Sequence, residues 1–177
     1  MRKIILLTFA ALVPVLAIAG FAAASERSEA AKVAAATAPY HDLQVAKDAG
    51  WNVHVADLKG ITCIANGSDG AMGDHFANGS LLFDNGVIDA TQPEALVYET
   101  RNDGTFKLVA LEYIVTKGDW DGAHGKDAPR PELFGQPFDF SDATNRFGLP
   151  PFYSLHAWIW KDNPSGLLKP WNPKVSC

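Results

Sequence analysis

Residues 106–116, FKLVALEYIVT, combine aromatic, β-branched and other apolar side chains over a length that suits one long strand. Alternate positions along a strand point to opposite faces of its sheet. The two sets of positions are Phe106, Leu108, Ala110, Glu112 and Ile114 on one face, and Val109, Leu111, Tyr113 and Val115 on the other. Because both sets are mainly apolar, we predict a strand buried on two sides, either central in a sheet or a stave of a barrel.

Glycines divide the chain after residue 50 into short segments rich in branched and aromatic residues, a pattern typical of strands joined by turns. The dipeptides Asn85-Gly86 and Asp103-Gly104 are strong turn signals. Further strands are predicted near Ile61–Ala65, Leu81–Phe83, Ala95–Glu99 and Tyr153–Trp160.

A short helix is predicted over Tyr40–Ala49, where Leu43 and Ala46 are apolar and Gly50 occupies the usual C-terminal capping position. No internal repeat is visible in the chain. Together these segments predict an α+β or mainly β fold, with an antiparallel sheet or small barrel and one N-terminal helix.

Residues 1–24 contain the three parts of a bacterial-type signal peptide in the right order. A positively charged start precedes an apolar run from Ile4 to Ala19, and small residues at 22–24 suit cleavage. A retained membrane helix is the alternative, since a spanning helix needs about 20 apolar residues. Pro14 and the small residues favour cleavage, which predicts a secreted or periplasmic protein without stable membrane insertion.

Cleavage of this leader leaves 153 residues, a length that suits one domain. Residues 25–38 are rich in Ala, Ser and Glu and are predicted to form a disordered tether, and residues 39–177 a single globular domain. Loss of the two cations in the leader changes the net charge from −5 to −7. So acidic a chain has no electrostatic attraction to nucleic acid or anionic lipid. A small-molecule ligand and any oligomeric state remain compatible with the sequence.

The chain contains two cysteines, Cys63 and Cys177. An exported chain reaches an oxidising compartment, where an even number of cysteines favours a disulfide over a free thiol or a metal ligand. We therefore predict one bond that closes a loop of more than 100 residues. This pairing also removes cysteine as a candidate nucleophile.

Three titratable residues are predicted to lie in unusual surroundings. Glu112 is mid-strand on an apolar face, where a carboxylate is costly unless it is paired, protonated or bound to a metal. His156 lies among aromatic residues, and His75 ends the glycine-rich stretch GSDGAMGDH, which we expect to place it at or near the start of a strand. Two imidazoles and a carboxylate suit zinc, iron or copper, so we hypothesise a site for one transition metal ion at His75, Glu112 and His156.

A structural interpretation of the same residues is the alternative. Glu112 and His156 would pair with one another or with backbone groups, and His75 would lie on a solvated loop. No sequence spacing enforces the triad, and no known hydrolase, metalloprotease, phosphate-binding, haem or calcium motif is present. The protein is then either a metal-binding protein, with or without enzymatic activity, or a non-catalytic ligand-binding or structural module of the cell envelope. The remaining histidines are expected to be solvated: His41, His54 and His124.

Carboxylates near predicted strand ends raise a further hypothesis. Glu94, Glu99 and Asp84 occupy such positions, although acids at strand ends are usually solvated. A pair of carboxylates about 5–9 Å apart hydrolyses glycosidic bonds, so a glycosidase is a further class to consider.

Tryptophans gather toward the C-terminus. Trp158, Trp160 and Trp171 would form an aromatic platform for a sugar or another flat ligand. The alternative is a role in the core, which is the usual use of aromatic residues. In that case the C-terminal segment folds back over the sheet and is held there by the disulfide.

Several phrases of the chain resemble a family of small secreted bacterial proteins without known activity. They are GAMGDHF (70–76), PEALVYE (93–99), LVALEYIV (108–115), LFGQPF (133–138) and the segment 155–177, which contains LHAWIWKDNPSGLL and WNPKVSC. The resemblance extends through most of the predicted domain, and it implies export and a single domain. The chain differs from the family at Asp74, where an aromatic residue is more common.

Overall fold

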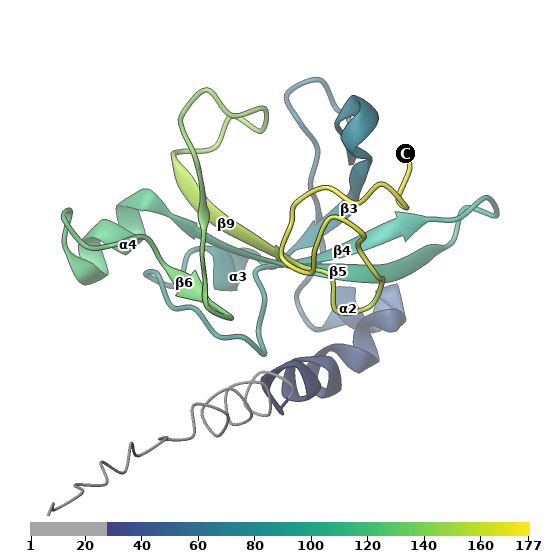
Figure 1. Ribbon diagram of the computed structural model, residues 1–177, viewed down its shortest axis with the longest axis horizontal. Helices are drawn as coiled ribbons and strands as arrows, with labels where there is room; N and C mark the ends of the chain where they lie inside the picture. Colours follow the sequence, from purple (N-terminus) through teal and green to yellow (C-terminus); the bar gives the residue numbers. More distant parts are fainter. Residues whose placement is uncertain (1–27) are drawn as a thin grey trace, which may run out of the picture.

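The computed structural model describes residues 28–177, so the predicted signal peptide at 1–24 lies outside the described residues, as do residues 25–27. Figure 1 shows one large, twisted antiparallel sheet as the centre of the fold. Its strands follow the order β1-β3-β4-β5-β9-β8, and β2 also pairs with β3. The bounds are β1 Val53–His54, β2 Cys63–Ala65, β3 Ala71–Ala77, β4 Ala95–Thr100, β5 Phe106–Thr116, β8 Asp139–Ser141 and β9 Phe152–Ala157, with β6 Glu132–Leu133 and β7 Gln136–Pro137 as a separate pair.

The predicted α+β class with an antiparallel sheet is confirmed, and the barrel alternative is wrong. Within residues 28–177 the sheet is open, because β1 and β2 at one edge do not pair with β8 at the other. The predicted strand at 106–116 is β5, which pairs with β4 on one side and β9 on the other. It is buried on both faces, as its sequence indicated.

A β-bulge at Val109 interrupts the simple alternation along β5. The residues of β5 that pair with β4 change from Ala110 to Leu108 across the bulge, which leaves one extra residue. Phe106 and Leu108 consequently lie on the face opposite Glu112, where they join the larger apolar core. The prediction that these two residues share the face of Glu112 is therefore wrong.

The sheet separates two apolar cores. In Figure 1, α2 (Leu43–Asp48) and the helical residues before it lie on one side of the sheet, and the C-terminus lies on the other. The larger core fills the side of α2 and is built around Phe76, Leu96, Tyr98, Leu111 and Tyr113. The smaller core on the opposite face contains Ala71, Val97, Val109, Ala110, Trp158 and Val175.

The helices are mostly short and lie in the connections. Helix α2 falls within the segment predicted to be helical, whereas α3 replaces the strand predicted at Leu81–Phe83. The Asn78 side chain accepts a hydrogen bond from the backbone N–H of Ser80, and this cap begins α3. No helix in residues 28–177 is long and apolar enough to cross a membrane. The bounds are η1 Ala38–His41, α2 Leu43–Asp48, η2 Gly67–Asp69, α3 Gly79–Leu82 and α4 Lys117–His124.

Residues 28–37 are helical and pack on the sheet. Val33 and Thr37, one helical turn apart, are fully buried, and the Thr37 hydroxyl accepts a hydrogen bond from Nε1 of Trp160. The prediction of a disordered tether over 25–38 is therefore wrong for its described part. Alanine favours a helix by propensity, and one buried valine on that helix is enough to dock it.

The C-terminal segment folds back over the smaller core, as one of the two alternatives for the tail predicted. Backbone hydrogen bonds join Asn172 to Ala71 in both directions, and a disulfide joins Cys63 to Cys177. Gly70 permits this contact, because its φ is +99° and a Cβ there would collide with the Asn172 carbonyl. The predicted disulfide is confirmed, and it holds the tail on β2.

Replacing both Cys63 and Cys177 with serine is expected to lower the free energy of unfolding by about 2–5 kcal/mol, because the bond closes a long loop. The two cysteines are 114 residues apart in the sequence. Urea denaturation of the wild type, with and without reductant, measures the effect. The double variant is the control, since reductant should leave its midpoint unchanged. Equal midpoints for the oxidised wild type and the variant would contradict the prediction.

Candidate metal centre

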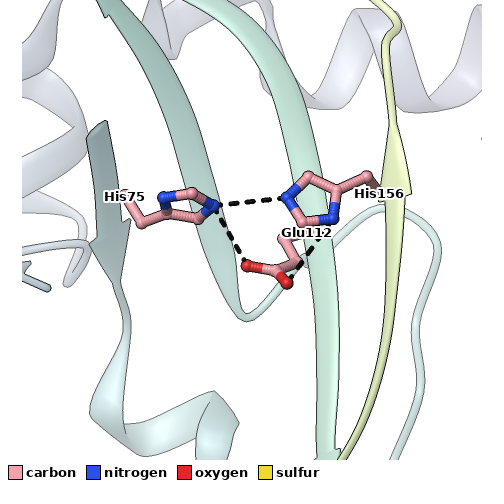
Figure 2. A group of neighbouring side chains, drawn as sticks. All are labelled: His75, Glu112 and His156. Carbon is pink, nitrogen blue, oxygen red and sulfur yellow. Dashed lines mark hydrogen bonds and ion pairs between the residues drawn. The ribbon is translucent and has the colours of Figure 1, made fainter. Parts of the chain in front are cut away.

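The three predicted ligands come from three strands and meet on one face of the sheet. His75 lies in β3, Glu112 in β5 and His156 in β9. Glu112 lies directly opposite His156 in the β5–β9 pair. Ala95 of β4 lies opposite Glu112 on its other side, and its small side chain does not separate Glu112 from His75. Figure 2 shows the two imidazoles pointing toward one another with the carboxylate between them.

The glycine-rich stretch before His75 is what lets β3 approach β4. Gly73 has a φ of +108°, and a Cβ at this position would collide with the backbone carbonyl of Tyr98. His75 was expected at or near the start of a strand, and it lies inside β3, whose first residues belong to this stretch. The glycines therefore set the position of the imidazole.

The donor atoms of the three residues converge closely. Nε2 of His75 lies 3.3 Å from Oε2 of Glu112 and 3.3 Å from Nε2 of His156. Nδ1 of His156 lies 3.5 Å from Oε1 of Glu112. One donor atom from each residue lies within 4.8 Å of the other two. The prediction that Glu112 has His75 and His156 as its partners is confirmed.

These separations suit donors that share one ion. A tetrahedral zinc site with metal–ligand bonds of about 2.0–2.1 Å separates its ligand atoms by about 3.3 Å. The contacts that Nε2 of His75 makes with Glu112 and His156 have this length. The separations of His75 from the other two residues therefore fit a shared metal, and all three donors lie within 4.8 Å of one another.

All three side chains are removed from water, with 5% of His75, 8% of Glu112 and 3% of His156 exposed. Burial lowers the pKa of His75 and of His156 to about 4, because water no longer stabilises the imidazolium. Burial raises the pKa of Glu112, and the nearby His75 opposes that change. Both rings are consequently neutral at neutral pH, and each has one nitrogen with a free lone pair.

One assignment of the ring protons gives most polar atoms of this cluster a hydrogen-bond partner without a metal. Nδ1–H of His156 donates to Glu112, and Nε2 of His156 accepts from Nε2–H of His75. Nδ1 of His75 is then left buried with no hydrogen-bond partner. Among the residues that the structure describes, it is the one buried side-chain nitrogen or oxygen without a hydrogen-bond partner. Such atoms are rare in native structures, so this one calls for an explanation.

The other histidines lie apart from this cluster. His54 stacks on Phe76 and bonds to Asp74 at 2.9 Å, and Asp74 also accepts a hydrogen bond from Thr100. Asp74 is therefore fully used in local pairing. All three histidines expected to be solvated are exposed: His41, His54 and His124.

The structure does not bring the three tryptophans together as a platform. Trp158 is buried in the smaller core, and its Nε1 donates to the Lys169 carbonyl at 2.6 Å. Trp160 instead packs against the larger core, on the other face of the sheet. Trp171 lies in the tail that covers the sheet, where its carbonyl accepts a hydrogen bond from Asn163.

Two of the carboxylates considered for glycoside hydrolysis, Glu94 and Glu99, lie apart, whereas Asp84 is close enough to Glu94 to add to the increase in its pKa that burial causes. Glu94 and Glu99 are five residues apart along one extended segment, which separates their backbones by about 16 Å. Glu99 forms an ion pair with Lys161 at 2.7 Å, and Asp84 accepts a hydrogen bond in a local turn. Glu94 is fully buried and accepts a hydrogen bond from the backbone N–H of Ile114 at 2.8 Å. Its burial is a feature that sequence reasoning missed.

Comparisons with known proteins give no match: no family model, no curated protein and no solved structure matches the chain. The site is therefore interpreted from its own chemistry.

Glu94 is expected to make stability fall with rising pH. Burial raises the pKa of Glu94 from 4.5 to about 8, so the folded protein holds this proton more tightly than the unfolded chain. Its contribution is fully present below about pH 4.5 and is lost as pH rises to about 8. The loss amounts to a few kcal/mol, at about 1.4 kcal/mol per pKa unit.

Glu94→Gln keeps an oxygen for the N–H of Ile114 and removes the titration. Urea denaturation over this pH range should therefore show a smaller fall in unfolding free energy for the variant than for the wild type. Parallel pH profiles for the two proteins would count against a buried, protonated Glu94.

Proposed function

We propose that this chain is a metal-binding protein that holds one transition metal ion through His75, Glu112 and His156. One observation carries the proposal: a donor atom from each of the three side chains lies within 4.8 Å of the other two. The donors come from separate strands of one sheet, so the fold itself holds them in place. Positions on strands hold a site more precisely than positions on loops.

The donor set supports zinc, iron or copper. Imidazole nitrogen suits these three ions, whereas calcium and magnesium prefer sites built from oxygen. Three protein ligands also leave at least one coordination position for another molecule. Catalytic zinc sites and non-haem iron sites with two histidines and one carboxylate share this arrangement.

The surroundings of Nδ1 of His75 are compatible with a ligand role. Metal ligation uses Nε2 of a histidine and moves the ring proton to Nδ1, which then donates to an outer acceptor. Nδ1 of His75 makes no hydrogen bond of normal geometry, and the backbone of Gly73, which opposes the lowering of the pKa of His75 by burial, is the group placed to accept this proton. Metal binding gives Nε2 a stronger partner than the two weak contacts at 3.3 Å.

A purely structural role is the second candidate. The contacts of 3.3 Å and 3.5 Å also fit a hydrogen-bonded network that positions β3, β5 and β9 relative to one another. The protein would then be a non-catalytic ligand-binding or structural module. The two candidates differ in one measurable property, the content of metal.

Untagged wild-type protein is expected to contain about one transition metal ion per chain by elemental analysis. Glu112→Gln should keep the fold and weaken metal binding by more than about 100-fold, since loss of even an outer partner of a ligand lowers affinity about 10–100-fold. His156→Ala should act in the same direction. His124→Ala is the matched control, because it removes an exposed imidazole outside the cluster.

Circular dichroism should show that Glu112→Gln remains folded. A wild type that stays metal-free after exposure to zinc, iron and copper, with stability unchanged by chelator, would leave the structural role as the remaining candidate. Metal that persists in Glu112→Gln at wild-type affinity would remove Glu112 from the site.

We also propose that the protein is exported to the periplasm or the medium. The leader pattern at 1–24 supports this location, and so does the disulfide between Cys63 and Cys177, which persists in oxidising compartments. The resemblance to small secreted bacterial proteins points the same way. The cleaved protein would retain all residues of the described fold.

The exported protein is expected to begin near Ser25 and to contain no free thiol, because the leader is removed and both cysteines are oxidised. Intact mass spectrometry should show the loss of residues 1–24 and of two hydrogens. Alkylation without reductant is the companion measurement. A retained leader or two alkylated cysteines would rule out the corresponding part of the proposal.

A further inference from the structure

A small cavity of about 50 Å³ adjoins the candidate metal centre. His75 and Glu112 form part of its wall, so two of the three proposed ligands face it. The rest of the lining is apolar. It includes Ala77, Ala95, Ile114, Phe147, Leu149 and Phe152.

Two alanines on neighbouring strands create the space. Ala77 in β3 lies directly opposite Ala95 in β4, and Ala95 in turn lies opposite Glu112 in β5. A larger residue at either alanine would fill the volume beside the carboxylate. The cavity therefore arises from these two small side chains, and Ala77 is two positions along β3 from His75.

The outer wall of the cavity is held by hydrogen bonds. The Asn145 side chain accepts from the backbone N–H groups of Phe147 and Leu149, both at 3.2 Å. The guanidinium of Arg146 donates to the buried carboxylate of Asp57 at 2.6 Å. These contacts fix the segment that carries Phe147 and Leu149, so the cavity has a defined size.

Size and polarity restrict the occupant. A cavity needs about 10–15 Å³ of accessible space to hold one water molecule, so this one suits a molecule of at most about four non-hydrogen atoms. A charged molecule would lose its hydration against apolar walls, with polar contacts only from the two proposed ligands. An uncharged, weakly polar molecule loses little hydration free energy on entering such a space.

We infer that the open coordination position of the bound metal takes an uncharged diatomic molecule of the class of dioxygen and nitric oxide. This inference rests on the proposed metal-binding function. The cavity admits such a molecule next to His75 and Glu112, and its volume is too small to enclose a larger organic ligand. Coordination is reversible binding at the metal, and no bond within the diatomic molecule is broken.

Anaerobic titration of the iron(II)-loaded protein with nitric oxide tests the inference. An iron–nitrosyl signal in electron paramagnetic resonance should saturate at one nitric oxide per iron. The organic dianion 2-oxoglutarate, which chelates iron but exceeds the cavity, should show no binding by calorimetry. Binding of 2-oxoglutarate at the iron, or a lack of nitric oxide binding, would overturn the inference.

Variants of the cavity separate its role from that of the metal ligands. Ala95→Val should retain iron and weaken nitric oxide binding by at least about tenfold, equivalent to about 1.4 kcal/mol. Ala77→Val should act similarly from the neighbouring strand. Ala110→Val is the matched control, because Ala110 is fully buried in the smaller core but does not line the cavity. Equal nitric oxide affinity in wild type and in iron-loaded Ala95→Val would also overturn the inference.

The failure of this inference can be told apart from that of metal binding. Without stoichiometric iron, the proposed function fails and the inference fails with it. Stoichiometric iron without nitric oxide binding refutes the inference alone. Xenon binding to the metal-free wild type, and its loss in Ala95→Val, independently reports whether the cavity admits a small apolar guest.

Discussion

The pairing of β5 with β9 is the constraint on which the candidate site depends, because it places Glu112 directly opposite His156. A slip of one residue between two strands moves every side chain of the slipped strand to the opposite face. Leu111 and Tyr113, the neighbours of Glu112, are fully buried in the larger core. A slipped β5 would place the carboxylate in that core and expose both apolar side chains to the other face. The apolar pattern of β5 therefore keeps the polar cluster in register.

Stability alone is a poor explanation for such a cluster. Removal of charged or polar groups from water is unfavourable, and apolar residues of similar volume in place of a buried ion pair are often equally or more stabilising. The same sheet face carries small and aromatic residues only a few positions away, in Ala95, Ala110 and Trp158. An all-apolar face is therefore compatible with this fold. Two imidazoles and a carboxylate at one point are therefore consistent with the metal binding proposed above.

The features predicted correctly from sequence are those set by local periodicity or by simple chemistry. Strand β5, the disulfide and the partners of Glu112 follow from alternation, cysteine count and the need to compensate a buried carboxylate. The bulge at Val109 and the docking of Val33 depend on residues far away in sequence, so no local pattern reveals them. Helix α4 at Lys117–His124 was missed because its two glycines resemble turn signals, although the Thr116 side chain caps its first turn.

The use of imidazole and carboxylate as proposed donors is chemically compatible with the presence of the disulfide. In an oxidising compartment a thiolate ligand would be exposed to oxidation, and a pair of cysteines would tend to form a disulfide. This chain uses both of its cysteines, Cys63 and Cys177, to hold the tail on the sheet. Its proposed metal ligands are imidazole and carboxylate, which form no disulfides. The covalent bond thus stabilises one part of this sheet face, and the proposed site on the neighbouring part uses donors that an oxidising compartment would leave intact.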